Sequence, residues 1–146
     1  MVSNAGFDVA PAWTGGDTAW STENVDATCG TSRSLSILGG LDQGPASPCF
    51  PVMPSMHYFF GYSVKVSAAN FPFECGVLLF DNPTCAFPRP NGGGTSPLGV
   101  TPPAGVWMAY RTDFTALGTS LSGLVSCGVG PALLDNVYVN RVSASF

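Results

Sequence analysis

Two segments at opposite ends of this sequence each set one carboxylate beside residues that should be buried in a β-sheet. Asp8 follows Gly6-Phe7 near the start of the chain, and Asp135 lies within the apolar segment 133–139 near its end. If the strands that carry them are neighbours, the two carboxylates share one polar site and repel each other unless a cation binds between them. The pairing therefore predicts that the first and last strands meet, and it indicates a bound cation at that point.

A second group of residues has the chemistry to bind a sugar. Alternation along 107–114 places Trp107, Arg111 and Asp113 on one face of an expected strand. The apolar C–H face of a pyranose stacks on an aromatic ring, while neighbouring polar groups fix the hydroxyls. Trp20 lies among polar residues and is the other main candidate, whereas Trp13 lies in a Gly-flanked turn. Burial is the alternative for each tryptophan, because large aromatic side chains are common in cores.

The cysteines favour disulfide bonds rather than a metal site or a catalytic thiolate. There are five of them, at Cys29, Cys49, Cys75, Cys85 and Cys127. None has the C-x₂₋₄-C spacing of zinc sites, and a catalytic cysteine would have only His57 as a partner, with no third group for a triad. Chains rich in cysteine and turns but poor in charge are typical of exported proteins. We therefore expect at least one disulfide, a secreted or cell-surface location, and one cysteine that is free or intermolecular.

No catalytic constellation can be assembled from the acidic residues or from known motifs. Glycoside hydrolysis needs two carboxylates about 5 to 9.5 Å apart across a cleft. Glu23, Glu74 and Asp113 have no evident mates among the nine acidic residues. The sequence contains no Gly-x-Ser-x-Gly elbow, phosphate-binding loop or dinucleotide fingerprint. We therefore predict that the chain is not an enzyme.

Composition favours a single all-β domain over residues 1–146. Only 10% of the residues are charged, and 18 Gly with 13 Pro provide many turns. The net charge of −4, without a basic stripe, argues against nucleic-acid binding. No apolar run reaches the roughly 20 residues that span a bilayer. No signal peptide is visible, so we expect an exported form to have lost it.

Period-two alternation predicts about eight to ten strands. The clearest covers 57–66, and the others cover 4–9, 20–25, 34–37, 50–53, 76–80, 107–114, 121–127 and 134–142. Pro, Gly and Ser fill most of 89–105, which we expect to be a long loop. Residues 81–84 have the composition of a turn. Strands separated by such turns predict an antiparallel β-sandwich of two sheets, most simply a jelly roll.

Motifs along nearly the whole chain resemble a known group of β-sandwiches. They are Asn4-x-Gly6-Phe7-Asp8, Trp13, Ser34-Leu35, Cys49-x-Pro51-Val52, Tyr58-x-Phe60, Trp107, Phe114-Thr115-Ala116 and Asp135-Asn136-Val137. The pattern resembles the carbohydrate-binding jelly-roll modules, most of all the CenC-like group of the CBM4/9/22 type. The resemblance implies an exported, non-catalytic module that recognises a polysaccharide or other glycan by aromatic stacking. The ligand-binding residues that we expect from their types and strand faces are Trp20, Trp107, Arg111 and Asp113, although members of the group often bury the residue at the Trp107 position.

The resemblance also implies particular disulfides. Exported members often carry one cysteine before a tyrosine-bearing strand and another after a central strand, and Cys49 and Cys85 occupy these two positions. Cys75, directly before the strand expected over 76–80, and Cys127, on the strand expected over 121–127, are the next candidate pair, although the remaining cysteines can pair in other ways. Cys29 is then left over.

A structural Ca²⁺ is the third implication of the resemblance. Modules of this kind commonly hold it between the acidic residue after Gly-Phe and an Asp of the last strand, which are Asp8 and Asp135 here. Backbone carbonyls around 28–32 would add ligands, since Ca²⁺ accepts about six to eight oxygens in irregular geometry. Asp8 replaces the longer Glu of many members, which would shift or weaken the site. The alternative is that both carboxylates only accept hydrogen bonds from backbone N–H groups at strand ends.

A second class of function stays open beside glycan binding. Low charge, exposed edge strands and an unpaired cysteine would suit a structural or adhesive β-sandwich that self-associates or binds protein partners. The placement of Trp20 and Trp107 should discriminate between the two classes. Exposed aromatics along one sheet favour a sugar, whereas buried tryptophans beside a flat apolar patch favour protein contacts.

Overall fold

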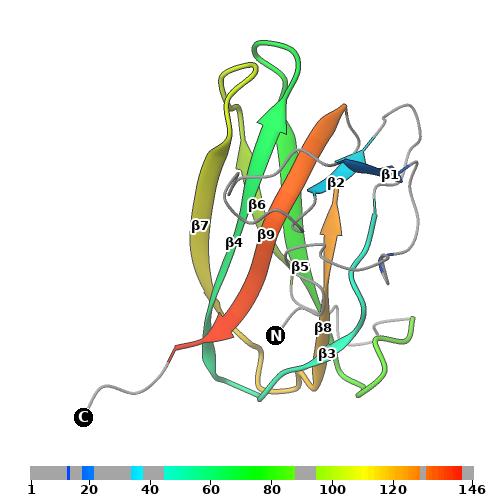
Figure 1. Cartoon of the computed structure of the whole chain (residues 1–146). Helices are drawn as coiled ribbons and strands as arrows, with labels where there is room; N and C mark the ends of the chain where they lie inside the picture. The colour runs from blue at the N-terminus through cyan, green and yellow to red at the C-terminus, as the bar shows by residue number, and fades with distance from the viewer. Residues whose placement is uncertain are drawn as a thin grey trace.

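The chain folds as a two-layer β-sandwich (Figure 1). The computed structural model describes residue 13 and residues 18–21, 34–37, 45–87, 95–128 and 131–142. Its nine strands are β1 (Thr18–Ser21), β2 (Ser34–Ile37), β3 (Phe50–Pro51), β4 (His57–Val66), β5 (Phe73–Phe80), β6 (Thr95–Val100), β7 (Met108–Thr115), β8 (Ser122–Cys127) and β9 (Ala132–Arg141). No helix within this described part of the chain could span a membrane.

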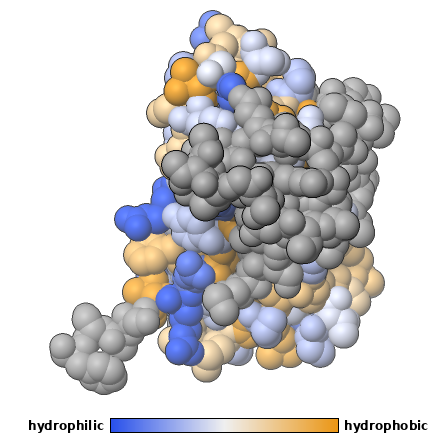
Figure 2. Space-filling view, in the orientation of Figure 1, coloured by the Kyte–Doolittle hydropathy of each residue, from blue (hydrophilic) through white to orange (hydrophobic). Residues whose placement is uncertain are grey.

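The strands form two antiparallel sheets that face each other. The five-stranded sheet has the order β1-β2-β9-β4-β7, and the four-stranded sheet has the order β3-β8-β5-β6. Every paired register in both sheets is antiparallel. The five-stranded sheet lies in front in Figure 1, and Figure 2 shows the same side of the molecule in space-filling form. The predicted antiparallel sandwich of two sheets is therefore confirmed.

The core lies between the sheets and is built from alternate residues of each strand. On β4 the predicted inward set is buried throughout: Tyr58, Phe60, Tyr62, Val64 and Val66. Inward residues of the facing strand β5 include Phe73, Cys75, Val77 and Leu79, which are also buried. Burying one such large apolar side chain contributes about 1.5–3 kcal/mol. The sandwich is thus stabilised mainly by the inner faces of its central strands, β4 and β9 in one sheet and β5 and β8 in the other.

One buried tyrosine joins the two sheets through its hydroxyl. The Tyr62 hydroxyl donates a hydrogen bond of 2.6 Å to the carbonyl oxygen of Leu98 on β6. Burial raises the pKa of the Tyr62 phenol well above its usual value, because the phenolate would lose its hydration. The folded state therefore keeps this proton at a pH where the unfolded chain releases it.

We predict that this tyrosine weakens the fold in alkali. The contribution of Tyr62 to the free energy of unfolding is constant below the unfolded pKa of about 10. Above that pH the free energy of unfolding falls, because the tyrosine of the unfolded chain loses its proton. Tyr62→Phe should remove this part of the decline, although it also leaves the Leu98 carbonyl without its partner. Denaturant unfolding of both proteins between pH 7 and pH 11 measures the difference. Parallel pH profiles would contradict the prediction.

The predicted loop over 89–105 is wrong in its middle, where β6 spans Thr95–Val100. Within the described part of the chain, this strand pairs with β5 alone, at the edge of the four-stranded sheet. An edge strand tolerates Pro97, because a residue there can lack an N–H on the free side. Exposed and half-exposed residues alternate along β6, so pairing with β5 overrides a low intrinsic strand propensity.

Other predicted strands are found with small shifts at their ends. The strands over 34–37 and 57–66 have the predicted bounds, and the strand predicted over 76–80 begins earlier, at Phe73. The strand predicted over 50–53 is shorter, Phe50–Pro51. The expected strand over 4–9 lies outside the described residues, as does 22–25 of the strand expected over 20–25.

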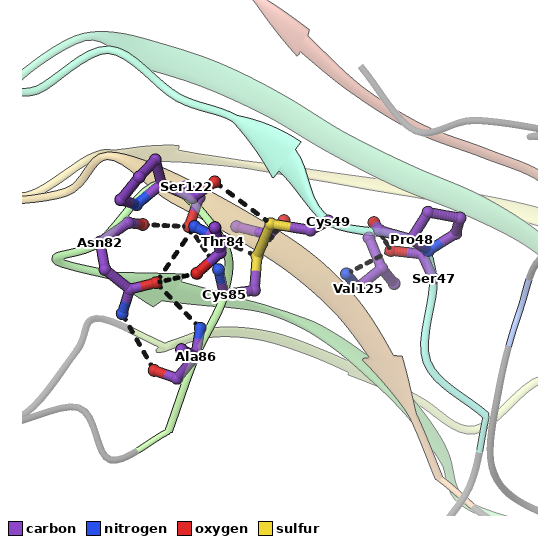
Figure 3. The surroundings of a disulfide bond; sticks show 11 residues. Ser47, Pro48, Cys49, Asn82, Thr84, Cys85, Ala86, Ser122 and Val125 are labelled. Atoms are coloured by element: carbon purple, nitrogen blue, oxygen red, sulfur yellow. Dashed lines mark hydrogen bonds between the residues drawn. A yellow bond between two sulfur atoms is a disulfide. The ribbon is translucent and has the colours of Figure 1, made fainter.

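Both predicted disulfides are present. Cys49–Cys85 ties the segment before β3 to the turn after β5, and Cys75–Cys127 joins register partners on β5 and β8. The predicted turn over 81–84 is present as well. There the Asn82 side-chain oxygen accepts hydrogen bonds from the backbone N–H groups of Thr84 and Ala86, at 3.1 and 2.9 Å (Figure 3). Cys29 lies outside the described residues.

Candidate functional site

Polar and aromatic side chains gather on the outward face of the five-stranded sheet. The set, here called the outer-face cluster, consists of His57, Phe59 and Gly61 on β4, Arg111, Asp113 and Thr115 on β7, and Tyr138 and Asn140 on β9. Residues of one strand alternate between its two faces, so these positions point away from the core. Figure 2 shows hydrophilic side chains over the lower parts of β4, β7 and β9 on this side of the molecule.

Tyr138 reaches across β4 at Gly61. A Cβ atom at Gly61 would overlap the phenol end of the Tyr138 ring and would lie 2.6 Å from the Tyr110 carbonyl oxygen. Glycine inside a strand often marks such a close approach. The half-buried Tyr138 ring thereby forms one wall of a hollow of about 430 Å³, whose lining includes Arg111 and Asn136.

A β-bulge in β9 determines where Asn136 lies. Gly61 pairs with Tyr138, but Ser63 pairs with Asp135, so β9 carries one residue more than β4 over this interval. Asn136 adopts a φ of 47°, a left-handed conformation that Asn tolerates better than most residues. Bulges change the direction of side chains and are frequent beside functional sites. Here the bulge leaves Asn136 exposed at the hollow.

Arg111 is held by an aromatic ring. Its guanidinium carbon lies 4.6 Å from the centroid of the Phe59 ring, a cation–π contact. Arg111 is exposed, and Phe59 is half-buried. The contact restricts a long side chain while its N–H groups stay available to a ligand.

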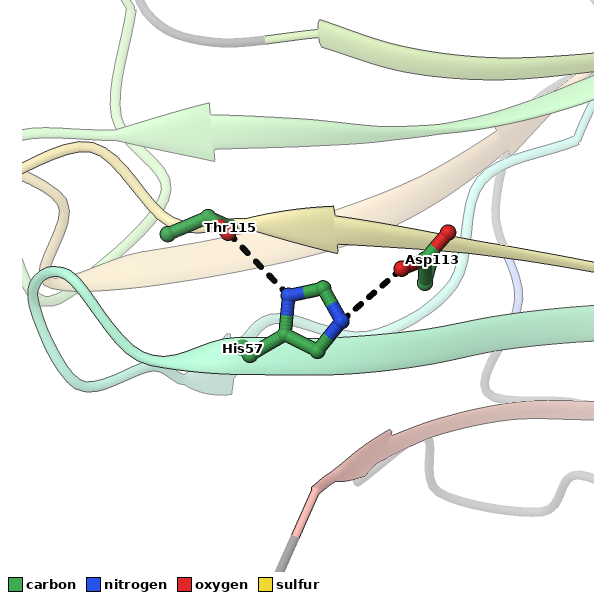
Figure 4. Close-up of polar contacts among 3 residues, drawn as sticks. All are labelled: His57, Asp113 and Thr115. Carbon is green, nitrogen blue, oxygen red and sulfur yellow. Dashed lines mark hydrogen bonds and ion pairs between the residues drawn. The ribbon is translucent and has the colours of Figure 1, made fainter.

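His57 forms an ion pair or hydrogen bond with the carboxylate of Asp113, which lies two residues after Arg111 on β7. Its Nε2 lies 2.8 Å from Oδ2 of Asp113, and its Nδ1 lies 3.1 Å from Oγ1 of Thr115 (Figure 4). The His57 and Asp113 side chains are 44% and 58% exposed, so the pair contributes little to stability. The cysteine–histidine alternative receives no support from these contacts, because the four cysteines in the described ranges are all disulfide-bonded.

The structure brings two of the four predicted ligand residues together. Arg111 and Asp113 lie on the same side of β7 within the outer-face cluster. Trp107 is half-buried and precedes β7, roughly 14 Å along the chain from Arg111 at about 3.4 Å per residue. Trp20 lies on β1, at the opposite edge of the sheet from β7, and its side chain is outside the described part. Trp13 is buried in the core.

Sequence reasoning missed Tyr138, Asn136 and the contact of Phe59 with Arg111. The available signal was Gly61, which interrupts an otherwise bulky strand. Nothing in the sequence shows which aromatic ring fills the gap. Only the register of β9 against β4 places Tyr138 there.

The expected calcium site is described only in part. Asp135 is buried, and its Oδ1 accepts a hydrogen bond of 2.8 Å from the backbone N–H of Asn136. Such a carboxylate suits either a metal ligand or the alternative role of backbone acceptor. Asp8 and residues 28–32 lie outside the described residues. Among the residues that are described, no group of three or more His, Cys, Asp or Glu could hold a metal ion. The Ca²⁺ site stays a prediction.

Solved structures with this fold are recognised at low sequence identity. The CBM22-1 xylan-binding domain of Paenibacillus barcinonensis Xyn10C is 17% identical over 97% of this chain and 94% of that domain, with a TM-score of 0.63. The fold is that of the CBM4/9/22-type jelly rolls. A Clostridium thermocellum xylanase structure with CBM22-1 and GH10 modules, complexed with xylohexaose, is 16% identical over 99% of this chain, with a TM-score of 0.64.

A third similar structure comes from a different kind of protein. The enzymatically active domain of tailspike protein 4 from bacteriophage CBA120 is 13% identical over 97% of this chain, with a TM-score of 0.65. The chain spans 28% of the xylanase structure and 21% of the tailspike structure. No protein-family model and no curated protein sequence matches the chain. At these identities the comparisons establish the fold.

Proposed function

We propose that this chain is a non-catalytic carbohydrate-binding module whose ligand lies on the outward face of the five-stranded sheet. The observation that carries the proposal is the hollow beside Gly61, where the Tyr138 ring forms a wall next to Arg111 and Asn136. A half-buried aromatic ring beside hydrogen-bonding side chains can bind both the apolar face and the hydroxyls of a pyranose. The presence of carbohydrate-binding modules among the similar structures supports the same conclusion.

Binding would combine stacking with directed hydrogen bonds. The C–H face of one sugar unit packs on Tyr138, while the Arg111 guanidinium and the Asn136 amide bond its hydroxyls. Trp107, directly before the start of β7, would contact a further sugar unit. Trp20 would contact sugar at the opposite edge of the sheet. Asp113 would accept hydrogen bonds from sugar hydroxyls through the oxygen that His57 leaves free. No step of this mechanism breaks a bond.

The first prediction for this site concerns Tyr138→Ala. On a glycan array and in calorimetric titrations with its hits, this variant should bind about tenfold more weakly or worse, because the stacking surface is lost. Phe87→Ala is the matched control, since Phe87 is an exposed aromatic residue that packs against Phe80 of the other sheet. Equal binding by Tyr138→Ala and the unmodified protein would overturn the proposed site.

A structural Ca²⁺ belongs to the proposal, with Asp8 and Asp135 as its carboxylate ligands. A ligand present at about one hundred times its Kd stabilises the folded state by about 2.7 kcal/mol. EDTA should therefore lower the melting temperature by about 5–10 °C for a domain of this size, and added Ca²⁺ should restore it. Asp135→Asn should make the melting temperature insensitive to EDTA. A melting curve of the unmodified protein that EDTA leaves unchanged would exclude the calcium site.

Export fits the same proposal. The two disulfides are stable in the oxidising conditions outside the cytosol. A secreted or cell-surface location would also give the module access to extracellular polysaccharides.

Self-association is the second candidate function. Met53, Leu117 and Leu121 expose large apolar side chains on neighbouring loops, which are joined where the backbone N–H of Ser55 bonds to the Leu117 carbonyl and that of Val52 to the Leu121 carbonyl. These loops lie at the lower end of the sandwich in Figure 1, and none of the three residues is among the described residues that line the hollow. A blank glycan array together with concentration-dependent association in sedimentation would favour this candidate. Glycan binding by a monomer would favour the first.

A further inference from the structure

One charged side chain is present among the described residues that line the hollow. It is that of Arg111, and the described part of the lining contains no carboxylate. Among the described residues, no carboxylate contacts the Arg111 guanidinium, which lies over the ring of Phe59. An arginine with exposed N–H groups and no anionic partner is a ready partner for a ligand anion.

The carboxylate on the same side of β7 as Arg111 is bound to another residue. Asp113 lies two residues further along the same side of β7, at a distance of roughly 7 Å for an extended strand. It is paired with His57 at 2.8 Å, and Thr115 holds the other ring nitrogen of His57. The His57–Asp113–Thr115 contacts therefore occupy the Asp113 carboxylate, while the Arg111 guanidinium lies on Phe59.

The other polar groups at the hollow suit a sugar ring. The exposed Asn136 amide supplies both donors and an acceptor, and the Tyr138 ring supplies an apolar surface with a hydroxyl at its end. Stacking on Phe59 fixes the guanidinium before a ligand arrives. A planar guanidinium binds a planar carboxylate through two parallel hydrogen bonds, which a neutral hydroxymethyl group cannot accept in the same way.

We propose that the preferred ligand of this hollow is an acidic sugar, a hexuronic acid unit whose carboxylate pairs with Arg111 while its ring packs on Tyr138. This inference rests on the proposed function and names the class of glycan for the same site. It makes affinity dependent on salt, because an exposed ion pair is screened at high ionic strength.

The test compares each acidic oligosaccharide with its own neutral form. Oligomers of galacturonic, glucuronic and mannuronic acid, and the same oligomers after reduction of the carboxyl group, are titrated calorimetrically at low and high salt. At least one acid should bind about tenfold tighter than its reduced form at low salt, and high salt should reduce the preference. Arg111→Gln should abolish the preference. Arg141→Gln should keep it, because Arg141 is an exposed arginine that bonds to Met53 instead.

Two further variants test the role of the His57 pair. His57→Ala frees Asp113 to pair with Arg111 and should reduce the preference for acids, whereas Asp113→Asn should preserve or increase it. A sulfated oligosaccharide separates carboxylate recognition from general attraction of anions, and it should bind more weakly than the uronic acid. Equal binding of both anions would overturn the assignment of a carboxylate.

The outcomes separate this inference from the proposed function. Equal affinity for acidic and reduced oligomers, with both lost in Tyr138→Ala, overturns the acidic ligand and leaves glycan binding in place. An Arg111→Gln variant that keeps the preference also overturns it. A protein that binds no oligomer of either kind overturns the acidic ligand, and a blank glycan array in addition overturns the proposed function.

Discussion

Removal of the Cys75–Cys127 disulfide should lower the free energy of unfolding by about 4 kcal/mol or more. The bond links residues separated by 52 positions, and closing a loop of that length restricts the unfolded chain by about 4 kcal/mol in the chain-entropy model. Both half-cystines are buried in the core, Cys75 completely. Replacing them leaves a cavity between β5 and β8, which adds to the loss. Denaturant unfolding of the double variant Cys75→Ala/Cys127→Ala measures the effect.

The other disulfide provides the matched comparison. Cys49–Cys85 spans 36 positions, so the loop contribution should also be about 4 kcal/mol. Cys49 is exposed and Cys85 is only partly buried, so the variant Cys49→Ala/Cys85→Ala should leave little cavity. We expect a smaller loss than for the buried pair. A larger loss on removing Cys49–Cys85 would contradict the role given to burial in the core.

The sequence is informative about this fold wherever a strand has one buried and one outward face. The period-two pattern of 57–66 predicts β4 with its bounds and its buried face, because a shift of one residue would expose five large side chains. The same alternation places Arg111 and Asp113 on the outward face of β7. β6 is not predictable in this way. Its Pro and Gly residues favour a loop, and only pairing with β5 makes the segment a strand.

The candidate site depends on pairing between strands that are far apart in the sequence. Tyr138 and Gly61 become neighbours through the register of β9 against β4, and the bulge at Asn136 changes that register within the pair. A single residue inserted into a register has no local signature in the sequence. By residue type, tryptophans are strong candidates for sugar stacking, which favours Trp20 and Trp107. Tyr138 lies in an apolar segment whose sequence suggests burial, so residue type alone does not select it. The chemistry of the site could be predicted, but its aromatic wall could not.

Gly61→Ala should damage the binding site and the fold together. The new Cβ would overlap the Tyr138 ring and crowd the Tyr110 carbonyl oxygen, which lies 2.6 Å from its position. A backbone atom in a paired strand cannot move without breaking hydrogen bonds between the strands, so we expect a loss of about 1–3 kcal/mol in the free energy of unfolding. Displacement of Tyr138 should also weaken glycan binding about as much as Tyr138→Ala does. Thermal unfolding and calorimetric titration of the same preparation measure both effects.

Gly118→Ala is the control for replacing a glycine in this chain. A Cβ at Gly118 would lie 3.5 Å from Oγ of Ser55, an ordinary contact, so stability should stay unchanged or rise by up to about 1 kcal/mol. The double variant Gly61→Ala/Tyr138→Ala separates the two clashes at β4. It should recover only part of the lost stability, because the crowding of the Tyr110 carbonyl remains after the ring is removed. Full recovery would assign the whole cost to Tyr138, and no recovery would mean that the Tyr138 ring does not occupy the space above Gly61.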